Sequence, residues 1–368
     1  MGALLKPLIA SAGIGVPVLM PAILFAYGEQ GVWYDPSDIT TLYQDAAGTT
    51  PVTATGQPVG RVLDKSGRGN HATQSTAARK LLYNTLPSRL SLDKVDDQLV
   101  ITVPSGGWTG TMVLATDQGT ASYGITIPAG AYNLGGLYFP GSTIVGAIFR
   151  NGSLTAAESA ATEAYFVANG STAGYGAVTS FSSFWRSRAE ITSFPLINTA
   201  NGTLFFAAWA GCSSLTSFPL IDTSSATSVN SAWANCILLT SFPLINTSGV
   251  TNLSFAWFSC SSLPSFPLID TSSGTVFVQA WQGCTLLTSF PANFFDNIKG
   301  GDLRDAFGNT NLNQTSIDGI LASLVTSGIA TGTRVFNQSG GSAPSAAGNA
   351  SITTLRSRGW TVTVTGGF

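Results

Sequence analysis

The sequence predicts a mainly β chain built from an N-terminal antiparallel β-sandwich, a solenoid of 24-residue coils and a C-terminal α/β cap. Three kinds of landmark residue recur at an unbroken interval of 24 in the second half of the chain. Short apolar runs separated by turn residues precede this repeat, and helical spacing follows it. The predicted parts are an apolar N-terminal segment (1–30), the sandwich (31–172), the solenoid (173–311) and the cap (312–368).

Composition narrows the class of function. The 368 residues suffice for more than one core, and the 41 glycines are typical of turn-rich β structure. Charged residues make up 9% and the net charge is −2, which predicts no nucleic-acid partner. His71 is the single histidine, so the usual general base of hydrolases is nearly absent. We therefore expect a protein that is not an enzyme and has no catalytic residue, metal or cofactor.

Residues 3–25 form an almost wholly apolar run, long enough to cross a bilayer. Pro7, Pro17 and Pro21 interrupt it, and proline is costly inside a helix. Lys6 is its sole basic residue and no small-residue cleavage site closes it, as a signal peptide would require. Burial against partner chains is favoured, with a membrane-active segment or a signal peptide as the alternatives.

Residues 31–172 read as brief strands joined by turns, which is the pattern of an antiparallel sandwich. Apolar runs are predicted as strands at 96–103, 111–116, 123–130 and 142–149. Asp64 and His71 stand in a turn-rich stretch between them. They could hold a ligand, but a hydrogen-bonded loop is the favoured interpretation.

The repeat has three landmarks, and no insertion breaks any of them. Its core ladder is predicted to consist of Trp209, Trp233, Trp257 and Trp281, of Cys212, Cys236, Cys260 and Cys284, and of Phe218, Phe242, Phe266 and Phe290. Phe194 and Trp185 precede them by one step, so a degenerate first copy begins near Phe181. An equal interval means that each copy is one coil of a stack and that equivalent residues lie above one another. In each coil a turn is expected to lead into a short strand at Phe-Pro-Leu-Ile.

The tryptophans and cysteines each allow more than one interpretation. Buried free thiols are favoured for the cysteines over a zinc site, whose ligands have shorter spacings, and over disulfides between coils. Core packing is favoured for the tryptophans over a sugar-stacking strip.

An Asn or Asp followed by Thr comes after each Phe-Pro-Leu-Ile, in the order Asn198, Asp222, Asn246, Asp270. These side chains can bond the backbone ahead of them and close a turn. The alternation places like charges two coils apart, which lowers their repulsion. A pair of carboxylates for sugar hydrolysis, Asp222 with Asp270, is the alternative.

The 24-residue repeat gives way to another residue pattern in the C-terminal part. Residues 316–328 have helical spacing, with Ser316 as the expected N-cap and Gly328 as the stop. A strand, a second helix and a last strand at 360–365 are expected to follow. Such a unit would cover the open end of the stack.

The ordered motifs of residues 181–310 resemble the BspA-type leucine-rich repeats, with Trp where that family usually has Phe. This resemblance implies recognition, often of cell surfaces. The motifs of residues 33–37 and 63–72 are similar to the opening of laminin-G/concanavalin-like modules in bacteriophage tail proteins, and residues 151–170 resemble the closing strand and short helix of that module. The module is short in its middle, so no sugar or calcium site is carried over.

Together these resemblances imply a bacteriophage tail fibre, tip or baseplate protein located in the virion, which binds a glycan or protein receptor on the host surface. Residues 3–25 would join it to other tail proteins, and tail-fibre resemblance implies a homo-oligomer such as a trimer. The alternatives are a bacterial cell-surface adhesin anchored by residues 3–25 and, last, a glycan-degrading tail enzyme. The receptor-binding residues are expected among polar, exposed side chains of the repeated turns: Thr223, Ser224, Ser225, Thr247, Ser248, Thr271 and Ser272.

Overall fold

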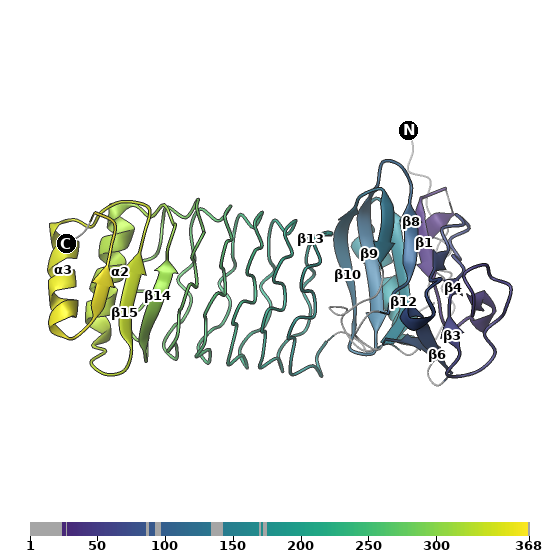
Figure 1. Ribbon diagram of the computed structural model, residues 1–368, viewed down its shortest axis with the longest axis horizontal. Coiled ribbons are helices and arrows are strands. Elements are labelled where there is room, and N and C mark those ends of the chain that lie inside the picture. The colour runs from purple at the N-terminus through teal and green to yellow at the C-terminus, as the bar shows by residue number, and fades with distance from the viewer. Residues whose placement is uncertain are drawn as a thin grey trace.

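A computed structural model describes residues 24–26, 28–85, 88–92, 97–133, 143–168, 171 and 175–366. The predicted mainly β class is confirmed, with 25% of residues in strands and 14% in helices. Figure 1 shows an elongated molecule with antiparallel sheets at one end and helices α2 (Gln314–Ser327) and α3 (Ala346–Ser357) at the other. A row of narrow coils connects these two ends.

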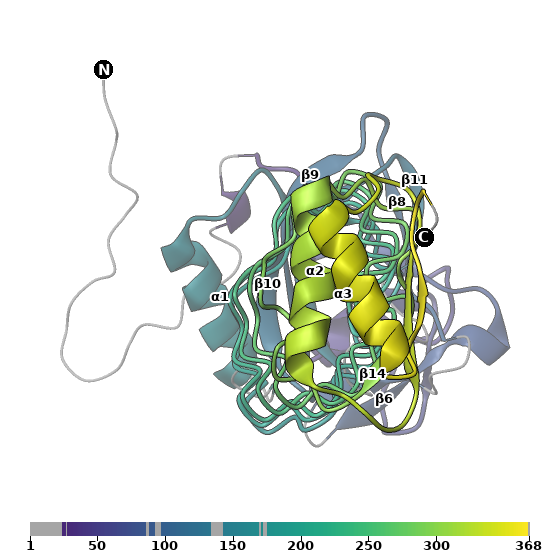
Figure 2. The same ribbon diagram turned by 90° about the vertical axis from the view of Figure 1, so that its left-hand side faces the viewer.

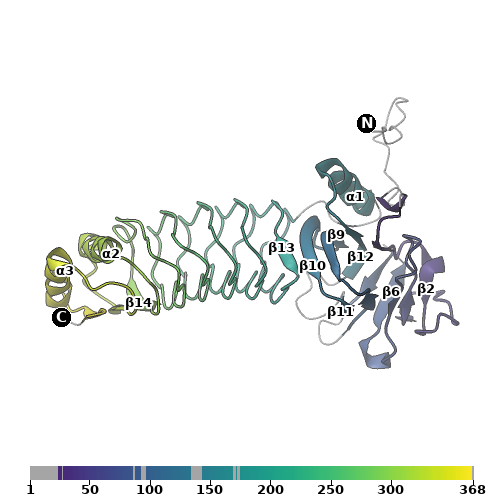
Figure 3. The same ribbon diagram turned by 90° about the horizontal axis from the view of Figure 1, so that it is seen from above.

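The larger antiparallel sheet has eight strands, in the order β13-β10-β9-β12-β7-β6-β3, with β1 also paired to β12. Its strands are β1 (Gly31–Tyr34), β3 (Pro58–Val59), β6 (Leu81–Thr85), β7 (Ser88–Ser91), β9 (Trp108–Thr116), β10 (Thr120–Ile127), β12 (Thr143–Asn151) and β13 (Ile191–Ser193). Helix α1 (Ala156–Ala168) follows β12 and lies beside β9 and β10 (Figure 3).

The smaller antiparallel sheet has five strands, in the order β11-β8-β5-β4-β2. They are β2 (Leu42–Tyr43), β4 (Arg61–Val62), β5 (Ala72–Thr73), β8 (Val100–Val103) and β11 (Gly130–Asn133), and single 3-10 turns lie at Ile39–Thr41 and Ala77–Arg79. Val62 and Ile101 of this sheet share one core with Leu90 and Met112 of the larger sheet. Two predicted runs are longer than their strands. Within its described residues, the run 96–103 becomes a strand only from Val100, and the run 123–130 ends early because residues 128–129 turn the chain from β10 into β11.

The first coil is fastened to the sheets by β13, which pairs antiparallel with β10. Arg188 donates to Glu190 at 2.5 Å and to the hydroxyl of Tyr132, in β11, at 2.8 Å. The Tyr132 hydroxyl in turn donates to Glu190 at 2.7 Å. The indole N–H of Trp185 donates to the Tyr123 hydroxyl, in β10, at 3.0 Å. The coils therefore continue from the sheets through paired backbone and a largely buried ionic network.

Successive coils are joined by parallel backbone bonds at matching positions of the repeat. Parallel bridges link Ser180, Leu204, Ser228, Asn252, Val276 and Asp302 in succession. The N–H of Trp209 donates to Ala232 O at 2.8 Å, and that of Trp233 donates to Ala256 O at 2.9 Å. The expected short strand at Phe-Pro-Leu-Ile is wrong, because its backbone turns: Ile245 N bonds to Pro243 O within its own coil.

Two backbone positions of each coil are left-handed, one two residues before the tryptophan and one two residues after it. Around Trp233 they are Ser231 and Asn235, with φ of 56° and 61°; around Trp257 they are Phe255 and Ser259, with φ of 55° and 57°. This conformation costs free energy in residues other than glycine. The alternation turns every second N–H toward the next coil, so the inter-coil bonds hold it in place.

Equivalent aromatic side chains stack along the interior. Neighbouring indoles from Trp185 to Trp281 lie 5.4–5.6 Å apart between ring centroids and are nearly parallel. The phenylalanines Phe194 to Phe290 stack beside them at 5.6–6.1 Å. The predicted Trp, Cys and Phe ladder residues are all buried.

The C-terminal unit is a parallel sheet of β14 (Gly301–Phe307), β15 (Arg334–Gln338) and β16 (Thr361–Thr363), with α2 and α3 as its crossovers. It begins at Gly301 and not at 312, because β14 accepts backbone bonds from the last coil and pairs with β15 on its other side. The expected last strand at 360–365 is shorter, since β16 covers three of its residues. Figure 2 shows α2 and α3 across the end of the coils.

Helix α2 ends as predicted, with Gly328 in a left-handed conformation at φ 69°. The prediction that Ser316 is its N-cap is wrong. Asn313 caps the helix by accepting a bond from Ser316 N at 2.9 Å. The Ser316 hydroxyl accepts from Phe290 N at 3.0 Å and so ties α2 to the last coil.

Nearly all of the apolar segment 3–25 lies outside the described residues. Leu24 and Phe25 are its described members, and they are buried in a small cluster with Trp33, Ile148 and Tyr165. Within the ranges given above, none of the helices combines the length and the apolar character that crossing a bilayer requires.

Candidate functional site

The repeated turns after Phe-Pro-Leu-Ile form one edge of the coil stack. In each turn the Asn or Asp side chain accepts a bond from the backbone N–H two residues on. These bonds join Ala200 to Asn198, Ser224 to Asp222, Ser248 to Asn246 and Ser272 to Asp270, at 2.8–3.1 Å. The side chains therefore close the turns, which is the favoured interpretation of the sequence.

The threonine that follows each Asn or Asp was expected to be exposed, and this prediction is wrong. Thr223, Thr247 and Thr271 are only 1%, 0% and 4% exposed. The Thr223 hydroxyl donates to Asn246 O and that of Thr247 to Asp270 O, both at 2.5 Å. Thr271 makes the corresponding bond to Phe294 O. Each threonine turns inward because the carbonyl of the next coil lies within reach, so it holds two coils together.

The serines of the predicted binding set do reach the surface. Ser224, Ser225 and Ser248 are exposed, and Ser272 is half-buried. Asp222 is exposed beside Ser224, and Asp270 holds the same place two coils further on. This edge thus presents hydroxyls, amides and two carboxylates, all on a backbone fixed by the threonines.

The two carboxylates ionise more readily than usual. The hydroxyl and backbone N–H of Ser224 lower the pKa of Asp222 below the ordinary 3.8, and Ser272 does the same to the pKa of Asp270. A lowered folded-state pKa means that ionisation stabilises the fold above the unfolded value and that this contribution is lost as pH falls through the folded value.

We expect the melting temperature of the wild type to fall more steeply than that of the Asp222→Asn/Asp270→Asn variant between about pH 5 and about pH 3. Asparagine keeps the turn, as at Asn198 and Asn246, but does not titrate. Thermal unfolding followed by circular dichroism at several pH values measures this. Parallel curves for the two proteins would contradict the assignment.

The cysteine thiols tie neighbouring coils from the inside. Each donates to the carbonyl of the tryptophan one coil earlier, in the pairs Cys212–Trp185, Cys236–Trp209, Cys260–Trp233 and Cys284–Trp257, at 3.1–3.3 Å. All four are free and buried. Burial raises the pKa of Cys236 and of Cys284 to about 12. The indoles are equally enclosed, so the sugar-stacking alternative is wrong for these tryptophans.

We expect all four cysteines to resist a thiol reagent at about pH 8 in the folded protein, because the thiolate is the reactive form. After unfolding in denaturant, four thiols per chain should react. Mass spectrometry of protein alkylated with and without denaturant measures this. Rapid labelling of the folded chain would show that the thiols are not enclosed.

Asp64 and His71 belong to a closed loop, in agreement with the favoured interpretation. The Asp64 carboxylate accepts from Trp33 N, Ser66 N, the Ser66 hydroxyl and Asn70 N at 2.7–3.1 Å. His71 Nδ1 accepts from Asp64 N at 3.0 Å. Burial lowers the pKa of His71 below its ordinary value. The loop uses these groups to hold β1 against the turn that follows β4.

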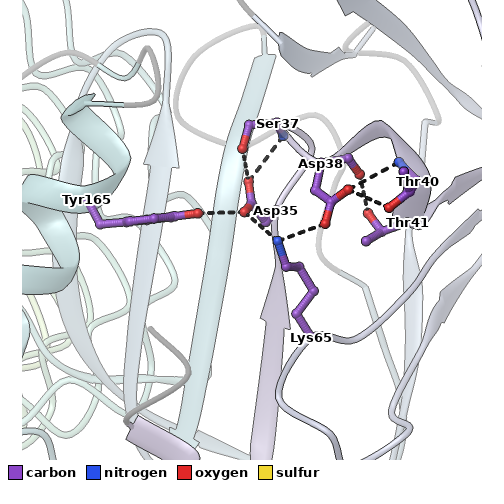
Figure 4. A network of polar contacts seen from close by, with 7 residues as sticks. All are labelled: Asp35, Ser37, Asp38, Thr40, Thr41, Lys65 and Tyr165. Atoms are coloured by element: carbon purple, nitrogen blue, oxygen red, sulfur yellow. Dashed lines mark hydrogen bonds and ion pairs between the residues drawn. The ribbon is translucent and has the colours of Figure 1, made fainter. Parts of the chain in front are cut away.

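A second polar cluster, shown in Figure 4, was not predicted. Lys65 Nζ lies 3.0 Å from a carboxylate oxygen of Asp35 and 3.0 Å from one of Asp38. The Tyr165 hydroxyl, from α1, donates to Asp35 at 2.6 Å. Lys65 also lies 4.6 Å from the Trp33 ring centroid. The cluster holds α1 and the loop after β1 together, and one lysine is shared by its two carboxylates.

A partly open apolar cavity, lined by Leu90, Leu114 and Ile144 of the larger sheet among others, has a volume of about 10 Å³, which is too small for an organic ligand. In the part of the chain that the structure describes, no group of three or more His, Cys, Asp or Glu side chains is placed to hold a metal ion.

None of the protein-family models, curated proteins or solved structures compared with the chain matches it.

Proposed function

We propose that the chain is a structural protein of a bacteriophage tail, in its fibre, tip or baseplate, and that its coils bind a receptor on the host surface. The fold is assigned in finer detail to a shortened laminin-G/concanavalin-like β-sandwich, a leucine-rich-repeat-like solenoid and an α/β cap. The receptor is a glycan or a protein.

One observation carries the proposal: the coil stack is joined to the sheets at one end and to α2 and α3 at the other (Figure 1), while side chains along its sides are exposed. Such a stack offers a long surface of fixed geometry. The exposed serines Ser224, Ser225 and Ser248, with half-buried Ser272, supply hydrogen-bonding groups along it. The inward threonines Thr223, Thr247 and Thr271 position these serines and are not themselves part of the receptor surface.

Residues 3–25 would join the chain to other tail proteins, and copies of the chain would associate, as a trimer for instance. Both statements rest on the apolar sequence and on the resemblance to tail proteins. A particle component of this kind needs no catalytic group. Asp222 and Asp270 do not support the glycan-degrading alternative, since a glycosidase requires a carboxylic acid of raised pKa and the pKa of each of these two is lowered.

Two measurements test the proposal. Antibodies against the chain should label purified virions at the tail, and the recombinant chain should slow adsorption of those virions to host cells. Replacing Ser224, Ser225 and Ser248 together by alanine should remove the competition while the protein stays folded, which circular dichroism checks. Recovery of the chain in bacterial envelopes and not in virions would favour a surface adhesin. Glycan cleavage that Asp222→Asn and Asp270→Asn each abolish would favour an enzyme.

A further inference from the structure

Four leucines, one in each of four successive coils, stand on the outside of the stack. Leu196, Leu220, Leu244 and Leu268, here called the leucine row, are 71%, 61%, 62% and 53% exposed. Single exposed leucines are ordinary, but an ordered apolar row on a soluble surface marks an interaction site.

The row has a fixed geometry because each leucine lies between two positions that are locked from coil to coil. Two residues before Leu220, Phe218 stacks on its neighbours at 5.6 and 6.1 Å. Three residues after Leu220, Thr223 bonds to the next coil at 2.5 Å. The same pair flanks Leu244, with Phe242 stacked at 6.1 and 5.7 Å. Consecutive leucines therefore stand one coil apart, about 4.8 Å if the spacing is that of paired strands.

A line of polar side chains runs beside the row, two residues after each leucine: Asn198, Asp222, Asn246 and Asp270, all exposed. Between Glu190 and Asp296 the sequence contains no charged residue other than Asp222 and Asp270. This face is therefore apolar, and both charged side chains in the polar line along its margin are negative. The two carboxylates stand two coils apart, about 10 Å.

The next position of the row lies beside a helix. There Ala292 replaces leucine and is exposed, and a β-carbon placed on Gly319 of α2 would lie 3.6 Å from Ala292 Cβ. A helix of the molecule thus lies next to this line without covering it. Over the four preceding coils the larger leucines remain exposed.

We propose that the leucine row and its margin of Asp222 and Asp270 bind a basic amphipathic helix of a partner protein. A helix rises about 5.4 Å per turn, so one lying along the row places one side chain per turn near each coil. Residues seven apart on a helix are about 10.5 Å apart, which matches the spacing of the two carboxylates. Lysines or arginines at that interval would face them while leucines on the same side cover the row.

The proposal is independent of the tail assignment, since it rests on the coil surface alone. A second copy of this chain fits the surface less well. Two such faces would bring the negative margins together, and the face carries no cation to offset them.

The test uses designed peptides and the full chain. The first probe is a fluorescein-labelled helical peptide of about 14 residues, four turns, with one leucine per turn and lysines seven residues apart beside them. A second probe has the same composition with the lysines moved to the opposite face. A third has glutamate in place of lysine. Fluorescence anisotropy gives the dissociation constant of each.

The first probe should bind saturably, and the other two should bind at least tenfold more weakly, roughly the effect of two exposed ion pairs. Asp222→Asn/Asp270→Asn should weaken the first probe by about the same tenfold. Leu220→Ser/Leu244→Ser should remove its binding. Leu204→Ser, an exposed leucine outside the row, is the matched control and should leave the binding unchanged.

Equal binding of the three probes, or unchanged affinity in the Asp222→Asn/Asp270→Asn variant, would overturn the proposal. So would failure of the first probe to bind. Light scattering gives the remaining outcome. If Leu220→Ser/Leu244→Ser converts an oligomer into monomers, the row is an interface between copies and the proposed partner is wrong. Circular dichroism melting curves show that each variant is folded.

Discussion

Replacing Trp233 by alanine is expected to lower the free energy of unfolding by about 4 kcal/mol, the cost typical of deleting a buried indole. Trp233 is fully buried at the middle of the stack. Its ring stacks on Trp209 and Trp257 at 5.4 and 5.6 Å and meets the edge or face of Phe242 at 4.8 Å. Alanine would leave a cavity that fixed coils cannot close, because backbone bonds to both neighbours hold the coil in place. Urea unfolding followed by tryptophan fluorescence and circular dichroism measures the loss.

Trp233→Phe is the matched control, and about 1.5 kcal/mol is expected for it. Phe307 shows that this position accepts the smaller ring, since it stacks on Trp281 at 5.1 Å. Phenylalanine also removes the indole N–H of Trp233, a buried donor that has no hydrogen-bond partner among the described residues. A loss as small for Trp233→Ala as for Trp233→Phe would contradict the stacked interior.

Replacing Arg188 by methionine is expected to cost about 3 kcal/mol, because it strands a buried acid. The side chains of Arg188 and Glu190 are each 12% exposed, and they lie 2.5 Å apart. The Tyr132 hydroxyl bonds to both of them. Methionine would fill the space but leave Glu190 without its cation. Since this network joins the first coil to β11, the sheets and the coils should also begin to unfold separately.

Arg304→Met is the control for this second variant. Arg304 pairs with Asp302 at 2.8 Å, but its side chain is 58% exposed, so no measurable loss is expected. Chemical unfolding compares the two variants. One spectroscopic signal should report on the sheets and a second should report on the coils. An Arg188→Met protein as stable as Arg304→Met, with a single unfolding transition, would show that the network does not couple the two parts.

The stacked interior could be predicted from the sequence because equal spacing leaves little choice. An interval of 24 residues without insertion places Trp209 over Trp185 and Cys236 over Cys212. The turn-closing role of Asp222 also followed from local chemistry, since its partner is two residues away.

The direction of the turn threonines could not be predicted from residue type, because Thr223 and Ser224 are both small and polar. The deciding partner of Thr223 is a carbonyl in the next coil, 23 residues along the chain. Alternation between inward and outward residues offered a signal: Ile221 is buried, Asp222 is exposed and Thr223 is buried. The leucines of the row also repeat at a fixed interval in the sequence. However, the residues around them do not show that Leu220 points outward while Ile221 points inward.

Other features depend on contacts that no local pattern reveals. Phe255 and Ser231 adopt left-handed backbone although neither residue favours it, because bonds to the next coil outweigh local preference. Tyr165 reaches Asp35 across 130 residues of sequence. Asn313, and not Ser316, caps α2, because the Ser316 hydroxyl accepts a bond from Phe290 N of the last coil.

The central claim is that equivalent residues of successive coils stack on one another. A crystal structure of the full chain tests it most directly, through the distance between equivalent indole rings. Neighbouring tryptophans from Trp185 to Trp281 should be 5.4–5.6 Å apart and nearly parallel, with the leucine row on the outside. Indoles dispersed over separate surfaces, or leucines turned into the interior, would contradict both the coil stack and the binding surfaces proposed on it.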